Sequence, residues 1–162
     1  MIIIAHASKN WGIGKNNDLM FKLPKDMKFF RETTSGGVVI MGRKTLESFP
    51  NKKPLPNRVN IVITRNTDYL PEGVIIAHSA EEAAKIAKEY TDRKVFVIGG
   101  AMIYDLMLPY SNTALITKVL ADSDADTFIH NFDADNDWEL FSQSDDIVDN
   151  GYTIRFCEYR RN

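Results

Sequence analysis

The chain has 162 residues, of which 44% are hydrophobic and 26% are charged, and these values are typical of one globular domain. Its apolar runs have about five residues or fewer, whereas a membrane span needs about 20 and the core of a secretory signal about 7–15, so we expect neither. The single cysteine, Cys157, excludes an internal disulfide and is compatible with a reducing cytoplasm. The net charge of −2 argues against a general nucleic-acid binder.

Charge is unevenly distributed along the chain. Residues 1–65 hold twelve Lys and Arg against four acids, a balance of +8, and the remainder holds eight against eighteen, a balance of −10. No Lys or Arg lies between Val119 and Ile154. A basic half predicts an anionic ligand attracted by its field, and the alternative is two differently charged solvent surfaces. Charge alone favours neither interpretation.

Short apolar runs rich in β-branched residues alternate with helical patterns. In chain order they predict a strand over Ile2–Ile4, a helix over Lys25–Thr33 opened by Pro24, strands over Val38–Met41, Val59–Ile63 and Val74–Ala77, a helix from Ser79 to about Tyr90, a strand over Val95–Ile98, a short helix between Gly100 and Pro109, and a strand over Leu115–Val119. Asn150-Gly151 then predicts the turn of a C-terminal hairpin. Several strands are apolar at consecutive positions, as strands covered on both faces are, so the class is α/β with a mostly parallel sheet and an antiparallel edge.

The segment Gly37–Thr45 differs from a phosphate-binding P-loop at one residue. Arg43 stands where that motif has Lys, and Val38–Met41 favours an extended strand where a P-loop needs an open arch of N–H groups. These differences argue against a P-loop nucleoside triphosphatase. A strand that ends at Gly42 and continues through Arg43 and Lys44 into a helix still predicts an anion site.

Another glycine motif is also incomplete. Gly12 and Gly14 begin like a dinucleotide fingerprint, but Asn17 stands where the third glycine belongs. The segment Asn10–Asn17 also reads as a loop rather than a helix start. A Rossmann interpretation therefore fails.

The acidic second half contains no metal motif. Asp122, Asp124 and Asp126 match the first ligands of a calcium loop, whose later glycine and glutamate are missing, so a solvated acidic loop is favoured. The histidines have no metal-ligand spacing with Cys157, which reads as a packing residue of the hairpin. We expect no metal.

Asp26 is a lone carboxylate on an apolar helix face. Leu23, Asp26, Met27 and Phe30 share one side of the predicted helix, with Met27 and Phe30 facing inward. One interpretation is an acid in the first helical turn that the helix dipole favours. The other is a buried carboxylate in an apolar pocket, with two oxygens that accept hydrogen bonds from a planar ring bearing N–H groups.

Gly99-Gly100 and two arginines are further candidates. Gly99-Gly100 lies between a strand and a helix, where it would let a pyrophosphate approach the backbone or would only make a tight turn. Arg65 follows a strand and could form a basic fork with Arg43 for a phosphate monoester. Arg58 follows the rigid Pro54–Pro56 segment, which could aim it at a carboxylate. Each arginine could equally be a solvated strand-end residue.

Seven stretches of the chain together resemble the dihydrofolate reductase family, close to its bacterial, Clostridium-like branch. They are N-W-G-I-G-K (Asn10–Lys15), L-P-K-D-M-K-F-F (Leu23–Phe30), V-I-M-G-R-K-T-L-E-S-F (Val39–Phe49), P-L-P-N-R-V-N-I-V-I-T-R (Pro54–Arg65), V-I-G-G-A-M-I-Y (Val97–Tyr104), L-I-T-K (Leu115–Lys118) and D-A-D-T-F (Asp124–Phe128). They occur in the family's order from end to end. The resemblance implies one domain over residues 1–162, with a central, mostly parallel sheet of about eight strands, an antiparallel C-terminal edge hairpin and about four flanking helices.

The resemblance also implies an activity. An enzyme of this family reduces dihydrofolate to tetrahydrofolate with NADPH, by hydride transfer to pterin C6 and protonation at N5, in support of one-carbon and thymidylate metabolism. It is expected to be a cytoplasmic monomer and an antifolate target, with a small-molecule substrate and neither nucleic acid nor membrane as a partner. The alternatives are a same-fold NADPH reductase of a riboflavin-pathway pyrimidine and a non-catalytic nucleotide-binding module. The pairing of Asp26 with Thr117 and Arg58 argues against the first alternative, and an acid on an apolar helix face argues against the second.

The site residues that the resemblance implies fall into two sets. Asp26 is the catalytic residue and would hold the pterin N3–H and 2-amino group, while Thr117 would bond that acid and Arg58 would clamp the carboxylate of the glutamate tail. The substrate-binding set is Ile4, Ala5, His6, Asp26, Met27, Phe30, Phe49, Lys53, Leu55, Arg58, Ile98, Tyr104 and Thr117. The NADPH-binding set is His6, Gly12, Ile13, Gly14, Lys15, Asn16, Asn17, Asp18, Leu19, Gly42, Arg43, Lys44, Thr45, Thr64, Arg65, His78, Ile98, Gly99, Gly100, Ala101, Met102, Ile103, Tyr104 and Leu106.

The same resemblance implies two local features, and the chain differs from the common family pattern at Met20-Phe21 and at His6. The Gly99-Gly100 bond is expected to be cis, and Gly12–Asp18 is expected to be a mobile loop that closes over the nicotinamide. Met20-Phe21 replaces the Pro-Trp of many members. His6 stands where a small Ala is frequent, so ligand affinity would differ if its side chain turns inward.

Overall fold

The computed structural model describes residues 1–16 and 18–162, so the predicted cofactor residue Asn17 lies outside the described residues. The chain forms two compact units. The first unit comprises Met1–Ile2 and Thr34–Tyr110, and the second comprises Ile3–Thr33 and Ser111–Asn162. Each is described by itself below.

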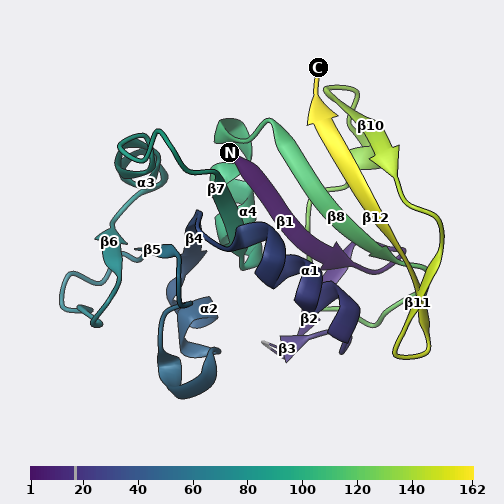
Figure 1. Ribbon diagram of the computed structural model, residues 1–162, viewed down its shortest axis with the longest axis horizontal. Coiled ribbons are helices and arrows are strands. Elements are labelled where there is room, and N and C mark those ends of the chain that lie inside the picture. Colours follow the sequence, from purple (N-terminus) through teal and green to yellow (C-terminus); the bar gives the residue numbers. More distant parts are fainter. Residues whose placement is uncertain (17) are drawn as a thin grey trace. The chain divides into compact units, whose positions relative to one another are not determined.

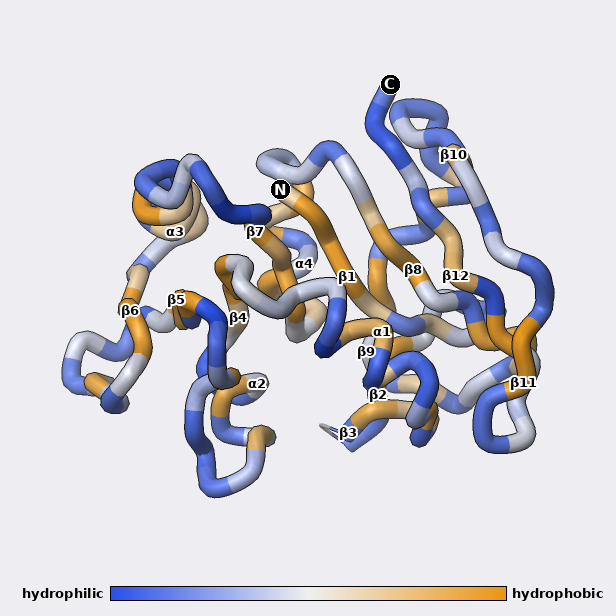
Figure 2. The backbone as a smooth tube through the Cα atoms, in the orientation of Figure 1, coloured by the Kyte–Doolittle hydropathy of each residue, from blue (hydrophilic) through white to orange (hydrophobic). Residues whose placement is uncertain are grey.

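The first unit contains parallel strands in the order β7-β4-β5-β6 (Figure 1). Their bounds are Val38–Gly42 for β4, Val59–Ile63 for β5, Ile75–Ala77 for β6 and Val95–Gly99 for β7. Residues 38–41 of β4 are all 0% exposed, as the consecutive apolar pattern predicts for a strand covered on both faces. The strands accordingly stand out as hydrophobic segments in Figure 2.

The first unit also contains three α-helices among its described residues, of which two connect these strands and one follows β7. They are α2 (Arg43–Glu47), α3 (Ala80–Ala87) and α4 (Ala101–Met107), and single 3₁₀ turns cover Pro50–Lys52 and Leu108–Tyr110. Ser79 caps α3, because its Oγ accepts the Glu82 N–H at 3.0 Å. The helix ends at Ala87 rather than continuing to the predicted Tyr90.

The second unit contains strands in the order β10-β12-β8-β1, with β11 also paired to β12. Their bounds are Ile2–Ala7 for β1, Thr113–Val119 for β8, Trp138–Gln143 for β10, Ile147–Asp149 for β11 and Tyr152–Arg161 for β12. The predicted hairpin is confirmed, since β11 and β12 pair antiparallel around Asn150-Gly151, both at positive φ. Because β12 pairs with both β8 and β10, the C-terminal strand is an inner strand and not itself an edge. Cys157 on β12 is buried, as predicted.

Helix α1 (Pro24–Thr34) begins at the predicted proline. A small sheet in the order β3-β2-β9 joins Gly12–Lys15 (β2), Asp18–Leu19 (β3) and Thr127–Phe128 (β9). The prediction of a loop over Asn10–Asn17 was therefore wrong for Gly12–Lys15. β2 pairs with β3, which follows closely in the chain, and with β9, more than 100 residues away, and the second pairing has no local signal.

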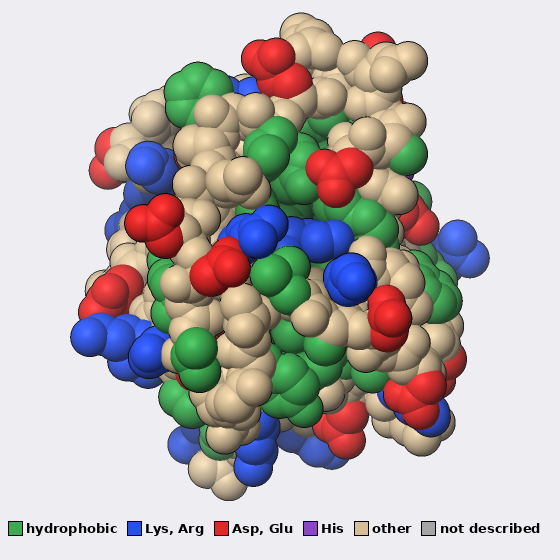
Figure 3. Space-filling view, turned by 90° about the vertical axis from the view of Figure 1, so that its right-hand side faces the viewer, with side chains coloured by type: hydrophobic (Ala, Val, Ile, Leu, Met, Phe, Trp, Pro, Cys, Tyr) green, Lys and Arg blue, Asp and Glu red, His purple; other side chains and the backbone are tan. Residues whose placement is uncertain are grey.

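The fold class is α/β, and residues 1–16 and 18–162 contain four α-helices and a mixed sheet of about eight strands, as predicted. Figure 3 looks onto the side of the molecule where β10, β11 and β12 lie and shows Lys and Arg side chains gathered among scattered acids. On β12, Arg155 pairs with Asp146 and Arg160 pairs with Glu158. No helix among the described residues is long and apolar enough to cross a membrane.

Candidate active site

Asp26 lies in the first turn of α1 and is only 9% exposed. Its backbone N–H donates to Asp149 Oδ2 at 3.1 Å, so a buried carboxylate from β11 caps the start of the helix. Asn150 Nδ2 also donates to the Lys22 carbonyl at 2.9 Å. The hairpin thus fixes the helix end that carries Asp26. This acid lies in the first helical turn, as one interpretation predicted, and is also buried, as the other predicted.

Two side chains from neighbouring strands reach the Asp26 carboxylate. Thr117 Oγ1 on β8 donates to Oδ1 at 2.6 Å, and His6 Nδ1 on β1 lies 3.1 Å from Oδ2. An ionised carboxylate has about four lone-pair sites, so each oxygen retains room for one further donor. The structure therefore brings together three predicted site residues that are far apart in the sequence and leaves the acid able to accept a pair of N–H groups.

Apolar residues near Asp26 in the sequence or predicted beside it differ in burial. Leu23 is 1% exposed and Ile4 is 4% exposed, whereas Phe30 is half-buried. The prediction that Met27 faces inward was wrong, because its side chain is 60% exposed. Leu23, Asp26 and Phe30 define the buried stripe, and position 27 lies a further 100° round the helix, beyond its edge.

The segment around β2 is held by the acidic loop that precedes β9. Lys15 pairs with Asp124, and the Asn16 N–H donates to Asp126 Oδ2 at 3.0 Å. These bonds lower the pKa of both aspartates, chiefly through the Lys15 side chain for Asp124 and the Asn16 N–H for Asp126. A Cβ on Gly12 would lie 2.4 Å from the Ala125 Cβ, so only glycine fits there.

The acidic loop is exposed, as predicted, but its bonds to the β2 segment were not predicted from the sequence. Asp149 was also missed, because nothing local marks it as a helix cap for a segment 123 residues earlier. Among the described residues, no group of three or more His, Cys, Asp or Glu side chains could hold a metal ion.

In the first unit, the parallel strands end at one level and bring the predicted phosphate-binding residues to one edge. Pairing places Gly42 beside Ile63, Ile63 beside Ala77, and Met41 beside Gly99. Carboxyl ends of parallel strands are the usual ligand edge of an α/β sheet. The residues that follow these strand ends, here called the strand-end edge, are Arg43, Lys44, Thr64, Arg65, His78 and Gly100.

The side chains of the strand-end edge are mostly exposed. Arg43 Nε lies 3.2 Å from Glu47 Oε1, and its guanidinium stacks on the Tyr69 ring. His78 Nδ1 lies 2.9 Å from the Thr64 carbonyl, which can only accept, so this nitrogen carries the proton. Helix α2 has only five residues, so the charge of these side chains, rather than a helix dipole, accounts for the predicted anion site.

The glycine turn after β7 has space for a ligand. The Gly99-Gly100 bond is cis, as expected, and Gly99 has a φ of 122° with the Tyr104 ring 3.4 Å from the position of a Cβ. A Cβ on Gly100 would meet no atom within 4 Å. Packing therefore does not require glycine at position 100, whereas the close approach of a pyrophosphate to the backbone would require it. The residues at this turn therefore fit a dinucleotide cofactor.

The segment that carries Arg58 is held rigidly. The buried Asn60 side chain bonds both backbone groups of Leu55 at 3.0 Å, a clamp that the sequence did not reveal. Arg58 Nη1 donates to Thr34 Oγ1 at 3.1 Å, and its Nε donates to the Pro56 carbonyl at 2.9 Å. The guanidinium is thus oriented rather than freely solvated.

The remaining predicted residues divide by exposure. Ile13, Gly14, Ile103 and Tyr104 are buried; Ala5, Gly42, Thr45, Phe49, Leu55, Ile98 and Ala101 are half-buried; Lys53, Asp18, Leu19, Met102 and Leu106 are exposed. The exposed apolar members include Leu19 and Met102, each 71% exposed. Exposed apolar side chains of this size suit contact with a ligand or a moving segment better than core packing.

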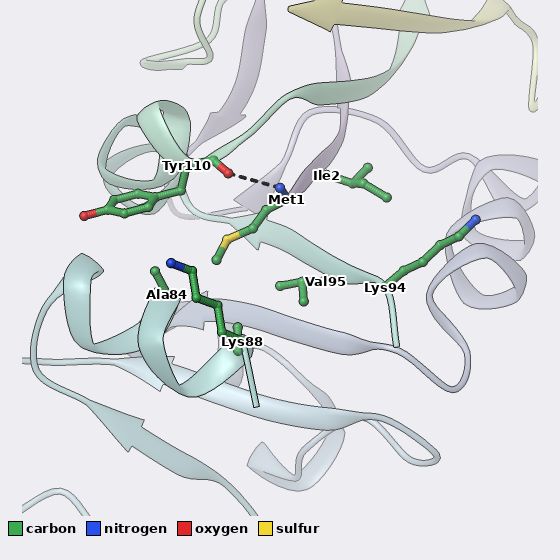
Figure 4. Close-up of a pocket in the computed structure, with 8 residues that line it drawn as sticks. Met1, Ile2, Ala84, Lys88, Lys94, Val95 and Tyr110 are labelled. Carbon is green, nitrogen blue, oxygen red and sulfur yellow. Dashed lines mark hydrogen bonds between the residues drawn. The ribbon is translucent and has the colours of Figure 1, made fainter. Parts of the chain in front are cut away.

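One cavity in the first unit lies away from the predicted site residues. It has a volume of about 370 Å³ and lies beside the chain terminus, where the Met1 amino group donates to the Tyr110 carbonyl at 3.0 Å (Figure 4). Its lining residues are Met1, Ile2, Ala84, Ala87, Lys88, Lys94, Val95 and Tyr110. None of these residues belongs to either predicted set, so this cavity does not mark the predicted site.

A basic strand-end edge with an open glycine turn and a buried, hydrogen-bonded carboxylate define the class: an α/β enzyme that takes a phosphate-bearing cofactor and a planar polar ring. Comparison with known proteins narrows the class. The sequence model described as dihydrofolate reductase matches residues 1–161. The chain belongs to the dihydrofolate reductase family.

Individual relatives agree with this assignment. The dihydrofolate reductase of Bacillus subtilis is 38% identical over 92% of this chain and 87% of its own length, and that of Staphylococcus haemolyticus is 36% identical over 98% and 94%. Among solved structures, dihydrofolate reductase from Enterococcus faecalis complexed with NADP(H) and RAB-propyl has a TM-score of 0.87. It is 34% identical and is matched over 99% of this chain and 95% of that one.

Proposed function

We propose that this chain is an NADPH-dependent dihydrofolate reductase, which converts dihydrofolate to tetrahydrofolate. The observation that carries the proposal is Asp26, a carboxylate 9% exposed whose two oxygens each accept one bond from the protein and retain room for another. A pterin presents N3–H and a 2-amino group side by side, and that donor pair matches two neighbouring carboxylate oxygens.

On the substrate side, Asp26 orients the pterin ring and the apolar residues around it exclude water. The ring accepts a proton at N5 during the reaction, and a carboxylate next to the ring favours the protonated form, directly or through a water. Ile4 and Phe30 supply apolar contacts, and exposed Met27 contacts the ligand rather than the core. Water exclusion strengthens each of these electrostatic interactions.

The substrate tail carries a carboxylate, for which Arg58 is the proposed partner. A guanidinium binds a carboxylate through two parallel hydrogen bonds, and this one is already oriented by Thr34 and Pro56. Phe49 and Leu55 would contact the aminobenzoyl group, and exposed Lys53 would add charge near the tail. Less rotamer entropy is lost on binding because the Arg58 side chain is already held by Thr34 and Pro56.

On the cofactor side, the strand-end edge would hold NADPH. Arg43, Lys44 and Arg65 would bind the adenosine phosphates, while Gly99 and Gly100 let the pyrophosphate approach the backbone. When bound, NADPH supplies the hydride, and the protein supplies orientation and a dry environment. The β2–β3 segment would close over the nicotinamide and is held by the loop of Asp124 and Asp126.

The finer assignments are part of the same proposal. The bacterial, Clostridium-like branch is supported by the ordered motifs, and a cytoplasmic monomer is supported by the family resemblance and the free, buried Cys157. A riboflavin-pathway reductase would have no use for a guanidinium directed at a tail carboxylate. A non-catalytic nucleotide-binding module would have no use for a buried carboxylate held by two side chains.

The direct test is to mix the purified protein with NADPH and dihydrofolate and to follow NADPH consumption. We expect turnover with dihydrofolate and none with a riboflavin-pathway pyrimidine. Folded protein that binds NADPH but consumes it with neither substrate would overturn the enzyme assignment.

A further inference from the structure

His6 contacts the acid that the proposed reaction depends on. Its side chain on β1 is 9% exposed, and Nδ1 lies 3.1 Å from Asp26 Oδ2. The other ring nitrogen, Nε2, is buried and has no hydrogen-bond partner among residues 1–16 and 18–162. The ring also lies against Phe21, at 6.2 Å between centroids. The function proposed above assigns no separate role to the His6 side chain.

The environment of His6 selects its protonation. An ionised Asp26 carboxylate can only accept, so Nδ1 must carry the proton that joins the two side chains. A proton on Nδ1 therefore satisfies the contact with Asp26, while Nε2 remains directed away from that carboxylate.

The charged groups near this contact come from two elements. Asp26 on α1 faces the ring directly, and Asp149 on β11 accepts the Asp26 N–H and so lies on the backbone side of the same acid. Thr117 on β8 is neutral and binds the opposite carboxylate oxygen at 2.6 Å. The carboxylate is thus held from two sides, by Thr117 at Oδ1 and by His6 at Oδ2.

We propose that His6 is a positioning residue, which holds the Asp26 carboxylate through Nδ1–H so that its two oxygens present one free lone pair each to the substrate. The role rests on the function proposed above, because it concerns how Asp26 meets the pterin. A carboxylate held only by Thr117 would rotate about its terminal torsion, which is broad for Asp. The carboxylate oxygens would then be aligned less often with the two N–H donors of the pterin ring.

Two substitutions separate positioning from simple packing. His6→Ala removes the ring and its donor, whereas His6→Asn places an amide N–H near the position of Nδ1 without a titrating group. We expect His6→Ala to raise KM for dihydrofolate about tenfold, the effect of losing one hydrogen bond to a charged group. We expect His6→Asn to recover most of that loss.

A matched control exists in the same unit. His130 Nε2 lies 2.8 Å from Asp135 Oδ2, so His130→Ala also breaks a half-buried histidine–aspartate pair but does not touch Asp26. It should leave both KM and kcat unchanged. Equal losses in His6→Ala and His6→Asn, or no loss in either, would overturn the positioning role, as would an equal loss in His130→Ala.

An NMR measurement tests the pair without any turnover. Long-range ¹H–¹⁵N spectra report which imidazole nitrogen bears the proton, and the chain has three histidines, so the His6→Asn variant assigns the His6 signals. We expect the proton of His6 on Nδ1 and a changed pattern in Asp26→Asn. A proton on Nε2 that does not respond to Asp26→Asn would overturn the proposal even if the enzyme is active. An inactive wild type with the expected spectrum would overturn the proposed function and leave the pairing intact.

Discussion

The Asp26 cluster, which consists of Asp26, Thr117 and His6, and the strand-end edge differ in how they are prepared to bind a ligand. Asp26 is 9% exposed and both its oxygens are hydrogen-bonded by the protein. Arg43 at the strand-end edge has a side chain 42% exposed, and its ion-pair partner Glu47 is on the same short helix. One site is fixed before a ligand arrives, and the other is a set of solvated charges on a rigid edge.

This difference predicts different sensitivities. A desolvated carboxylate depends on geometry, because its partners are few and each is strong in a low dielectric. Solvated cations act mainly through charge and are screened by salt. Substitutions in the Asp26 cluster should therefore change substrate handling and catalysis, and substitutions at the strand-end edge should change cofactor affinity alone.

The largest expected effect is that of Asp26→Asn. The amide keeps the shape of the side chain but loses the charge and one acceptor, so turnover at neutral pH should fall about 100-fold or more. NADPH binding, measured by fluorescence titration, should be retained. Glu32→Gln, an exposed acid on the same helix, is the control and should keep full activity. Unchanged turnover in Asp26→Asn would refute the assigned role.

Thr117→Val should have the next largest effect. It removes a buried hydroxyl that donates to Asp26 at 2.6 Å and keeps the shape of the side chain. Loss of a hydrogen bond to a buried charge predicts an increase in KM for dihydrofolate of about thirtyfold. Thr113→Val on the same strand, where the hydroxyl bonds only Asn112, serves as the control. Similar kinetics in the two variants would remove Thr117 from the substrate site.

Arg65→Ala tests the strand-end edge and should have a smaller, more selective effect. It should weaken NADPH about tenfold, as expected for the loss of an exposed contact to a phosphate, and NADH much less because NADH lacks the monoester phosphate. Arg93→Ala, which removes an arginine before β7, should affect neither cofactor. Dissociation constants of NADPH and NADH for the wild type and for Arg65→Ala test this prediction. Equal weakening of the two cofactors would exclude Arg65 from the phosphate site.

The smallest effect concerns the β2 segment and pH. Hydrogen bonds lower the pKa of Asp126 below its ordinary 3.8, so its contact with the Asn16 N–H is complete above pH 3.8 and is lost only as the pH falls through the lowered value. The Asn16 amide shift should therefore be constant across the neutral range and change only in strong acid. A change near neutral pH would show that another group holds this segment.

Much of the first unit could be predicted from sequence because its signals are local. Consecutive β-branched residues predicted Val38–Met41 and Val59–Ile63, and Ser79 with Glu82 predicted the start of α3. Parallel strands then bring Arg43, Arg65 and His78 to one edge by topology alone. These candidates needed no side-chain detail.

The second unit shows what local patterns do not contain. Met27 was predicted to face inward on α1 but is exposed, because residue spacing does not show where the buried side of a helix ends. Strand β2 and the helix cap from Asp149 depend on partners more than 100 residues away. The inward turn of His6 likewise depends on Asp26, which only the tertiary fold brings within reach.

The central claim is that the chain transfers hydride from NADPH to a pterin oriented by Asp26. The most direct measurement uses NADPH with both C4 hydrogens replaced by deuterium, dihydrofolate, and mass spectrometry with NMR of the product. The account predicts tetrahydrofolate with one deuterium at C6 from the wild type and almost none from Asp26→Asn in the same time. Folded wild-type protein that binds the labelled cofactor but forms no deuterated product would contradict it.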